Sequence, residues 1–334
     1  SLYHRFPTVE NFDSQIKEKT KNYSLNNRLI LVEALKHQNT NFPISEVTQT
    51  NIELLKFENT FTITTGHQLN LFTGPAYFIY KIASTINLCK QLKEKYSDYN
   101  FVPVYWMATE DHDFEEINHF NLKDKKIKWE RESSGPVGRL STEGLDKVFE
   151  EFSKAIGIGS NAEYLKELFK KSYLEHSNLA KATRFLANEL FSTEGLVIID
   201  GDDKNLKTLF APYIKDELIH QNSFRTVSKT INQLKNYTIQ VNPREINLFY
   251  IEDHLRERII LENNIYKINN TEIQFSEVEI LELLQNSPEK FSPNVILRPL
   301  YQEVILPNLA YIGGGGEIAY WLELKNNFNS QKVT

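Results

Sequence analysis

The sequence predicts an α/β fold built around a parallel sheet. Two apolar runs rich in strand-forming residues, 61–65 and 101–108, are separated by an amphipathic segment long enough for a helix. A strand, a helix and a second strand in this order form the βαβ unit of a parallel sheet. A further apolar run at 196–200 predicts another strand. At 334 residues the chain suffices for one large domain with insertions or for two domains.

The composition excludes several classes of protein. Hydrophobic residues make up 40% and charged residues 25%, as in ordinary soluble proteins. The net charge of −6 argues against nucleic-acid binding, which relies on a basic face. Cys89 is the only cysteine, so no intrachain disulfide forms. The apolar runs are shorter than the ~20 residues of a membrane span, and residues 1–12 show no signal peptide. We therefore expect a cytoplasmic protein that binds neither nucleic acid nor membranes.

The first half of the chain is predicted as follows. Residues 1–58 form a helical segment, because apolar residues recur there at helical spacing. The strand at 61–65 ends in a turn at Gly66, and Thr73-Gly74-Pro75 starts the next helix with a capping hydroxyl and a first-turn proline. The apolar face of this helix carries Phe78, Ile82, Ile86, Cys89 and Leu92, which makes Cys89 a core residue rather than a nucleophile.

The second half is predicted to contain two insertions and a glycine-rich turn. Residues 121–195 form a mainly helical insertion, and residues 237–275 form a β-rich excursion with strands at 237–241, 247–251 and 258–261. Four consecutive glycines, 313–316, are either a flexible linker or a buried turn where the backbone passes close to a ligand. Apolar residues on both sides favour the buried turn, with Gly314, Gly316 and Glu317 near a ligand.

The loop after the first strand is the first candidate site. A glycine there lets the backbone approach a ligand, and the following helix start offers N–H groups to an anion. We predict Thr65, Gly66, Gln68 and Gly74 as nucleotide-binding residues and His67 as a catalytic donor to phosphate oxygens. The alternative is a turn histidine bonded to the backbone. The loop matches neither the G-x-G-x-x-G nor the Walker A pattern.

The second candidate site, Glu110-Asp111-His112-Asp113, directly follows the second strand. Ligands of open α/β sheets gather outside the carboxyl ends of the strands, so both loops fall on the same edge. Such a cluster anchors an amine, moves a proton or binds a divalent metal, whereas acids also suit a solvated first helical turn. We predict Asp111 and His112 as catalytic, Glu110 and Asp113 as substrate-binding, and no dedicated metal, since H-E-x-x-H spacing is missing.

The third candidate site lies near the end of the chain. We predict Arg298, just past a short strand, and the preceding Asn294 as substrate-binding residues, because an arginine suits bidentate binding of a carboxylate or phosphate. For a lone arginine the alternative is a structural salt bridge.

Several collinear motifs resemble the bacillithiol-biosynthesis cysteine-adding enzymes, and together they cover most of residues 61–325. They are Thr65-Gly66-His67-Gln68 through Pro75, Tyr80-Lys81-Ile82, Pro103-Val104-Tyr105-Trp106, Glu110 to Asn118, Pro136-Val137-Gly138-Arg139, Ser292-Pro293-Asn294-Val295 with Arg298-Pro299-Leu300, and Gly316-Glu317-Ile318 with Tyr320-Trp321 and Glu323-Leu324-Lys325.

This resemblance implies a Rossmann-like core related to the nucleotide-using HIGH-type enzymes. It also implies a ligase that joins the carboxylate of L-cysteine to the amine of glucosaminyl-malate. A carboxylate does not acylate an amine unaided, so we expect ATP, with Mg²⁺, to activate it. His112 would accept the proton that the amine loses, and Arg298 would bind a malate carboxylate or a phosphate. Members of the family extend into a C-terminal coiled coil linked to homodimer formation, so this chain is expected to be a fragment.

Two other classes of function remain open from the residues alone. A metal-dependent hydrolase would use Glu110 to Asp113 as ligands, and a non-catalytic module would only bind small molecules.

Overall fold

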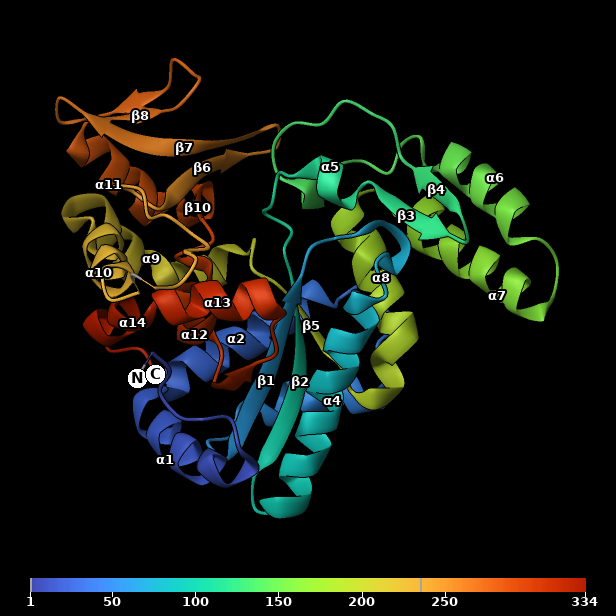
Figure 1. Ribbon diagram of the computed structural model, residues 1–334, viewed down its shortest axis with the longest axis horizontal. Helices are drawn as coiled ribbons and strands as arrows, with labels where there is room; N and C mark the ends of the chain where they lie inside the picture. The colour runs from blue at the N-terminus through green and yellow to red at the C-terminus, as the bar shows by residue number, and fades with distance from the viewer. Residues whose placement is uncertain (1, 235) are drawn as a thin grey trace.

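The computed structural model describes residues 2–234 and 236–334. A parallel sheet stands at the centre, an antiparallel sheet lies at one corner, and a mainly helical lobe extends on the opposite side (Figure 1). The first and last segments of the described chain are in contact: the Lys19 ammonium donates to the Thr334 carbonyl at 2.7 Å, and the Lys325 ammonium donates to the Tyr3 carbonyl at 3.0 Å.

The central sheet has four strands: β1 (Thr60–His67), β2 (Asn100–Met107), β5 (Val197–Asp200) and β11 (Asn308–Tyr311). Their order is β11-β1-β2-β5, and every neighbouring pair is parallel. β1 and β2 pair without a shift from Thr60 opposite Asn100 to His67 opposite Met107, so the loops that follow them start at the same level. This sheet confirms the predicted α/β class.

Helix α4 (Tyr77–Lys95) connects β1 to β2, and all five residues of its predicted apolar face are buried. The predicted helix start at Thr73 is wrong. Thr73 lies in a 3₁₀ turn, η2 (Leu71–Thr73), with φ 59°, and its side chain caps nothing. The preceding Phe72 also has positive φ, and its ring packs among those of Phe120, Phe152 and Phe169. The left-handed backbone at Phe72 and Thr73 thus ends the 3₁₀ turn, and the helix begins only at Tyr77.

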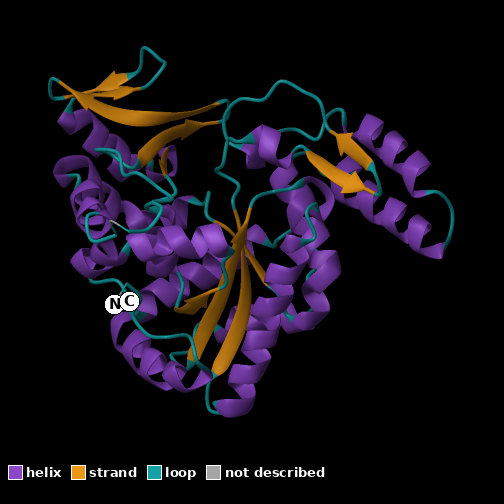
Figure 2. Ribbon diagram, viewed as in Figure 1, coloured by secondary structure: helices purple, strands orange, loops and turns teal. Residues whose placement is uncertain are grey.

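The remaining helices pack around the central sheet or form the lobe beside it (Figure 2). The N-terminal segment forms η1 (Val9–Asn11), α1 (Phe12–Asn22), α2 (Leu25–Gln38) and α3 (Glu46–Leu54). The lobe contains α5 (Phe114–Ile117), a hairpin of β3 (His119–Leu122) and β4 (Lys125–Lys128), η3 (Val137–Arg139), α6 (Leu145–Ile156), α7 (Ser160–Phe169), a π-helix (Lys170–Leu174), α8 (Leu179–Phe191) and η5 (Ser192–Glu194). No helix in the described part of the chain combines the length and the apolar character needed to cross a membrane.

The antiparallel sheet has the order β10-β6-β7-β8-β9. Its strands are β6 (Leu248–Glu252), β7 (Leu255–Glu262), β8 (Ile265–Ile268), β9 (Gln274–Phe275) and β10 (Phe291–Pro293). β6 and β7 occupy the predicted positions, but the strand predicted at 237–241 is wrong. The amides of Gln240 and Val241 instead donate to the Glu323 carboxylate, at 2.7 and 3.3 Å. A side chain thus takes the place of a neighbouring strand.

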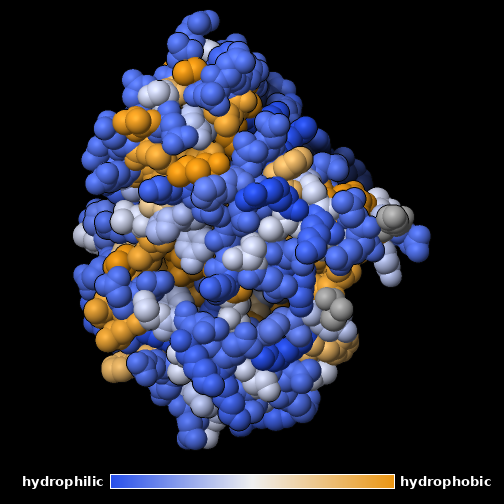
Figure 3. Space-filling view, turned by 90° about the vertical axis from the view of Figure 1, so that its left-hand side faces the viewer, coloured by the Kyte–Doolittle hydropathy of each residue, from blue (hydrophilic) through white to orange (hydrophobic). Residues whose placement is uncertain are grey.

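The last helices are α9 (Lys204–His220), α10 (Asn222–Ile231), α11 (Glu277–Asn286), η6 (Pro288–Lys290), α12 (Arg298–Ile305), α13 (Gly315–Glu323) and α14 (Lys325–Gln331). The buried turn predicted at the glycine run is wrong, because Gly315 and Gly316 are exposed and open α13. The Glu317 carboxylate accepts the Gly314 amide at 2.9 Å, and this cap turns the glycines into a helix start. The molecular face in Figure 3 is mostly hydrophilic, with hydrophobic side chains in separate patches.

Candidate active site

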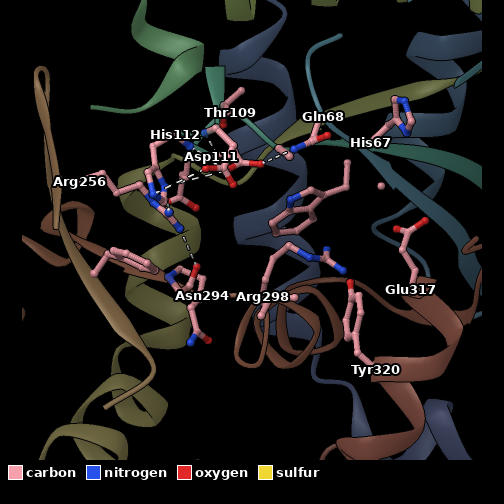
Figure 4. A pocket seen from close by; sticks show the side chains of 18 of the residues that line it. His67, Gln68, Thr109, Asp111, His112, Arg256, Asn294, Arg298, Glu317 and Tyr320 are labelled. Atoms are coloured by element: carbon pink, nitrogen blue, oxygen red, sulfur yellow. Dashed lines mark hydrogen bonds and ion pairs between the residues drawn. The ribbon is translucent and has the colours of Figure 1, made fainter. Parts of the chain in front are cut away.

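A cavity of about 720 Å³ opens at the carboxyl edge of the central sheet (Figure 4). The loops after β1 and β2 form one wall, and β6, β7 and the segment from Pro293 to Tyr320 form the other. A volume of this size suits a drug-sized ligand or cofactor.

The two predicted loops meet in this cavity. Its lining includes ten of the residues predicted for the site: Gly66, His67, Gln68, Glu110, Asp111, His112, Asp113, Asn294, Arg298 and Glu317. In Figure 4, His112 lies at one end and His67 at the other, with Arg298 between them. The structure therefore brings together three segments that are far apart in the sequence.

Four predicted residues do not line the cavity. The Thr65 hydroxyl donates to the Ile312 carbonyl at 2.8 Å, which joins β1 to the end of β11. A Cβ on Gly74 would lie 2.6 Å from the Phe120 Cβ, and one on Gly314 would lie 1.9 Å from the Tyr77 hydroxyl. Gly74 and Gly314 therefore permit close packing. Gly316 faces open space, with no atom within 4 Å of such a Cβ.

A buried ion pair forms one end of the cavity. The Lys81 ammonium on α4 donates to the Gly66 carbonyl and to the Glu317 carboxylate. The same carboxylate accepts the Tyr311 hydroxyl. Burial alone would raise the pKa of Glu317, but Lys81 and the Gly314 amide outweigh it and hold that pKa below its usual value. Glu317 is therefore a carboxylate at neutral pH, and it fixes α13 against α4.

His67 lies beside this pair and is neutral at physiological pH. Burial, reinforced by the nearby Lys81 charge, lowers the pKa of His67 to about 4. Its ring contacts those of Tyr77 and Phe78, at centroid distances of 6.1 and 5.4 Å. Its Nε2 atom is buried and has no hydrogen-bond partner in the protein. A neutral imidazole with an unpartnered nitrogen can bond a ligand.

Lys81 was missed as a site residue, although the sequence contained a signal for it. Lys81 stands three residues after Phe78 and four before Thr85, within the stripe of α4 that faces the core. A lysine on a buried stripe requires a specific partner. That partner, Glu317, comes from the other end of the chain, so spacing alone could not identify it.

The acidic loop divides into two parts. Glu110 is buried, and its carboxylate pairs with the buried Lys207 ammonium at 2.6 Å. Because this pairing neutralises it, Glu110 is a poor candidate for holding a substrate ammonium. Asp111 accepts the Gln68 side-chain amide at 2.9 Å and the His112 backbone amide at 2.7 Å. It therefore ties the β1 loop to the β2 loop.

Asp113 is the most available carboxylate of the loop. Its side chain is 57% exposed, and an oxygen lies 4.0 Å from His112 Nε2. Partial burial and the neighbouring Asp111 charge raise the pKa of Asp113 above its usual value. A carboxylate of this kind can hold an ammonium and accept a proton from it.

Arginines from the second half of the chain provide the positive charge of the cavity. Arg256 and Arg258 alternate on β7 and both reach the cavity, as does Arg244. Arg256 Nη1 lies 2.6 Å from His112 Nδ1. Arg258 Nε is buried without a hydrogen-bond partner in the protein, and so is Arg298 Nη2, although the Tyr320 hydroxyl interacts with the Arg298 guanidinium. Two N–H groups are thus left for an anionic ligand. The β7 arginines were not predicted as site residues, because the predicted strand began at Arg258 and left Arg256 outside it; in the longer strand that forms, their i, i+2 spacing gives them a shared face.

Arg298 and Asn294 differ in what they offer to a ligand. The Arg298 guanidinium lies over the Trp106 and Tyr311 rings, and it donates to Gln302 at 3.0 Å. The structural salt bridge considered for it is absent among the described contacts. Asn294 has both ends of its amide engaged, since Nδ2 donates to Asn247 at 2.9 Å and Oδ1 accepts the Ile296 amide at 2.9 Å. It shapes the loop before α12.

A second layer of charges holds the two walls together. Arg139 makes two hydrogen bonds to Asp202 after β5, at 2.8 and 3.0 Å, and one to Asp253 in the β6–β7 turn, at 3.1 Å. Asp202 also accepts the Lys207 ammonium at 3.2 Å. Arg139 therefore links the helical lobe, the central sheet and the antiparallel sheet.

A metal centre fits this cavity poorly. Within residues 2–234 and 236–334, Asp111, His112 and Asp113 are the three whose ligand atoms come within 4.8 Å of one another. The Arg256 guanidinium already occupies His112 Nδ1, and Glu110 is paired with Lys207. Both contacts argue against the alternative of a metal-dependent hydrolase.

Comparison with known proteins identifies the relatives of this chain. Residues 1–334 match the family described as bacillithiol biosynthesis BshC, N-terminal Rossmann-like domain. Proteins named "Putative cysteine ligase BshC" are 68% identical in Flavobacterium psychrophilum, 65% in Flavobacterium johnsoniae and 57% in Christiangramia forsetii, each over 100% of this chain. The chain spans 63% of the length of each of these relatives.

Proposed function

Because this chain belongs to the BshC family with its N-terminal Rossmann-like domain, we propose that it carries the reaction centre of a cysteine ligase. The observation that supports this proposal is that one cavity holds binding groups of both charges. It offers buried N–H groups without partners, on Arg258 and Arg298, together with the available carboxylate of Asp113. An amide-forming enzyme that joins an acid to an amine needs both kinds of group.

The proposed substrates are L-cysteine and glucosaminyl-malate. The malate carboxylates would pair with the free donors of Arg258 and Arg298, which suit carboxylate geometry. The sugar ammonium would lie against Asp113. Since the pKa of Asp113 is raised, its carboxylate would take the proton that the ammonium must lose before the nitrogen attacks. Asp113 replaces His112 in this step, because the Arg256 contact occupies the lone pair of His112.

ATP is the proposed source of activation. It would convert the cysteine carboxylate into a better acylating group, and Mg²⁺ would enter bound to its phosphate oxygens. The residues at the β1 end suit this role. Gly66 and His67 both line the cavity there, and the buried His67 Nε2, which has no hydrogen-bond partner in the protein, would bond a phosphate oxygen.

The decisive experiment is a ligation assay with purified protein. L-cysteine, glucosaminyl-malate and MgATP are incubated together, and the amide product is detected by mass spectrometry. We expect product only with ATP, and a fall in kcat of about 100-fold in Asp113→Asn, the usual range for loss of an acid–base group. Product formed equally without ATP, or full activity of Asp113→Asn, would contradict the assignments.

The full-length protein is proposed to be a cytoplasmic homodimer, as the family resemblance implies. Light scattering of the full-length protein measures this directly, and a monomeric mass at micromolar concentration would contradict it.

A further inference from the structure

Two nitrogens and one face of the Arg256 guanidinium are engaged by neighbouring groups, and the remaining nitrogen, Nη1, points at His112. Its Nε donates to the Ser292 hydroxyl at 3.2 Å, and its Nη2 donates to the Pro293 carbonyl at 3.3 Å. The guanidinium carbon lies 3.9 Å from the centre of the Phe249 ring. The remaining nitrogen, Nη1, lies 2.6 Å from His112 Nδ1 (Figure 4). β6, β7 and β10 thus fix one donor in place.

The chemistry of the two side chains decides where the histidine proton is. A guanidinium has only donors and stays protonated, so His112 Nδ1 accepts with its lone pair. A neutral imidazole then carries its proton on Nε2. An imidazolium would place two N–H groups against each other. The carboxylates of Asp111 and Asp113 each lie 4.0 Å from a ring nitrogen, beyond hydrogen-bond distance, so neither replaces the Arg256 contact.

We propose that Arg256 is a positioning residue that holds His112 as the neutral Nε2–H tautomer. His112 then donates a hydrogen bond from Nε2 to a ligand oxygen that gains negative charge, and it does not accept a proton. The tautomer stands on the geometry of the cavity alone. Only the role toward a reacting oxygen rests on the proposed ligase function.

Nitrogen NMR of the purified 334-residue chain tests the tautomer without any substrate. Histidines are labelled with ¹⁵N, and the His112 signals are assigned by their loss in His112→Ala. At pH 7 we expect an unprotonated Nδ1 and a protonated Nε2. In Arg256→Gln we expect a mixture of tautomers, and in Arg256→Lys a return toward the wild-type pattern. Arg258→Gln, two residues along the same strand, is the matched control and should leave the His112 signals unchanged.

Three outcomes of the NMR experiment would overturn the proposal. They are a protonated Nδ1 in the wild type, an imidazolium at pH 7, and wild-type signals in a folded Arg256→Gln protein. If Arg256→Gln fails to fold, the spectra of the wild type and of Arg256→Lys still decide which tautomer His112 adopts. None of these readings depends on ligase activity, so failure of the proposed function is seen separately.

The catalytic role is tested in the ligation assay. His112→Ala should lower kcat by about 100-fold, as loss of a donor to a developing charge does. Arg256→Gln should lower kcat by about 10-fold with little change in KM, and the double variant should match His112→Ala alone. Multiplied losses in the double variant would mean that Arg256 acts independently of His112, which would overturn this role.

Discussion

The Lys81–Glu317 pair gives a direct test of how the cavity is held together. In Lys81→Met the side chain keeps its apolar stem and loses its charge. Lys81 is 4% exposed, and removal of one partner from a buried ion pair costs about 3–5 kcal/mol. Glu317 is 26% exposed and keeps the bonds from Tyr311 and the Gly314 amide, so we take the lower value. The expected loss in the free energy of unfolding is therefore about 3 kcal/mol.

The magnitude translates into a measurable change in melting temperature. With an unfolding entropy of about 2.1 cal/mol/K per residue over 334 residues, 3 kcal/mol lowers Tm by about 4 °C. Glu317→Gln and the double variant complete a mutant cycle in urea and in calorimetry. We expect the double variant to recover part of the loss, since it no longer buries an unpaired carboxylate.

Lys90→Met on the same helix is the matched control, because the Lys90 side chain is 58% exposed. It should change stability by less than about 0.5 kcal/mol. If Lys81→Met behaved like Lys90→Met, or if the cycle were additive, the ion pair would not be what holds α13 against α4.

Three further predictions concern single positions. Gly66→Ala should displace the Tyr311 hydroxyl and lower the free energy of unfolding, measured in urea, by about 1–3 kcal/mol. Gly315→Ala, which faces open space on α13, should leave stability unchanged or raise it slightly. Equal effects of the two substitutions would refute the close packing of Tyr311 against Gly66. Folding lowers the pKa of His67 from 6.5 to about 4, so its contribution to the free energy of unfolding is present above pH 6.5 and is lost as pH falls toward 4. Between pH 7 and 5 the free energy of unfolding of the wild type should therefore fall by about 2 kcal/mol more than that of His67→Gln. Parallel curves of stability against pH would contradict this. Burial raises the pKa of the Cys89 thiol, so iodoacetamide should add no mass to the native protein at pH 8 and one adduct after denaturation.

The core of the fold could be predicted because its signals are local. β1, α4 and β2 follow one another in the chain, and each carries its own apolar periodicity. The rule that parallel strands end at one edge then placed Gly66–Gln68 beside Glu110–Asp113, which the cavity confirms. These residues required no knowledge of distant contacts.

The missed parts of the site depend on contacts between distant segments. Lys81 pairs with Glu317, and His112 meets Arg256, across separations of 236 and 144 residues. The prediction of a strand at 237–241 was wrong for the same reason, because the backbone amides of Gln240 and Val241 bind the distant Glu323 carboxylate of α13. Apolar periodicity reports burial, but it does not tell which charged group a buried charge will meet.

The edge strand β11 has a consequence for biosynthesis of the protein. Asn308 pairs with Thr62, so the partner of β1 on this side is synthesised 246 residues later. At ~5–20 residues per second, a ribosome needs roughly 12 to 49 s to cover that distance. During this interval one side of β1 has no strand beside it in the nascent chain. The cavity, whose lining includes Glu317 and Tyr320, can therefore be complete only after most of the chain has left the ribosome, and until then the unpaired edge of β1 is open to pairing with another chain.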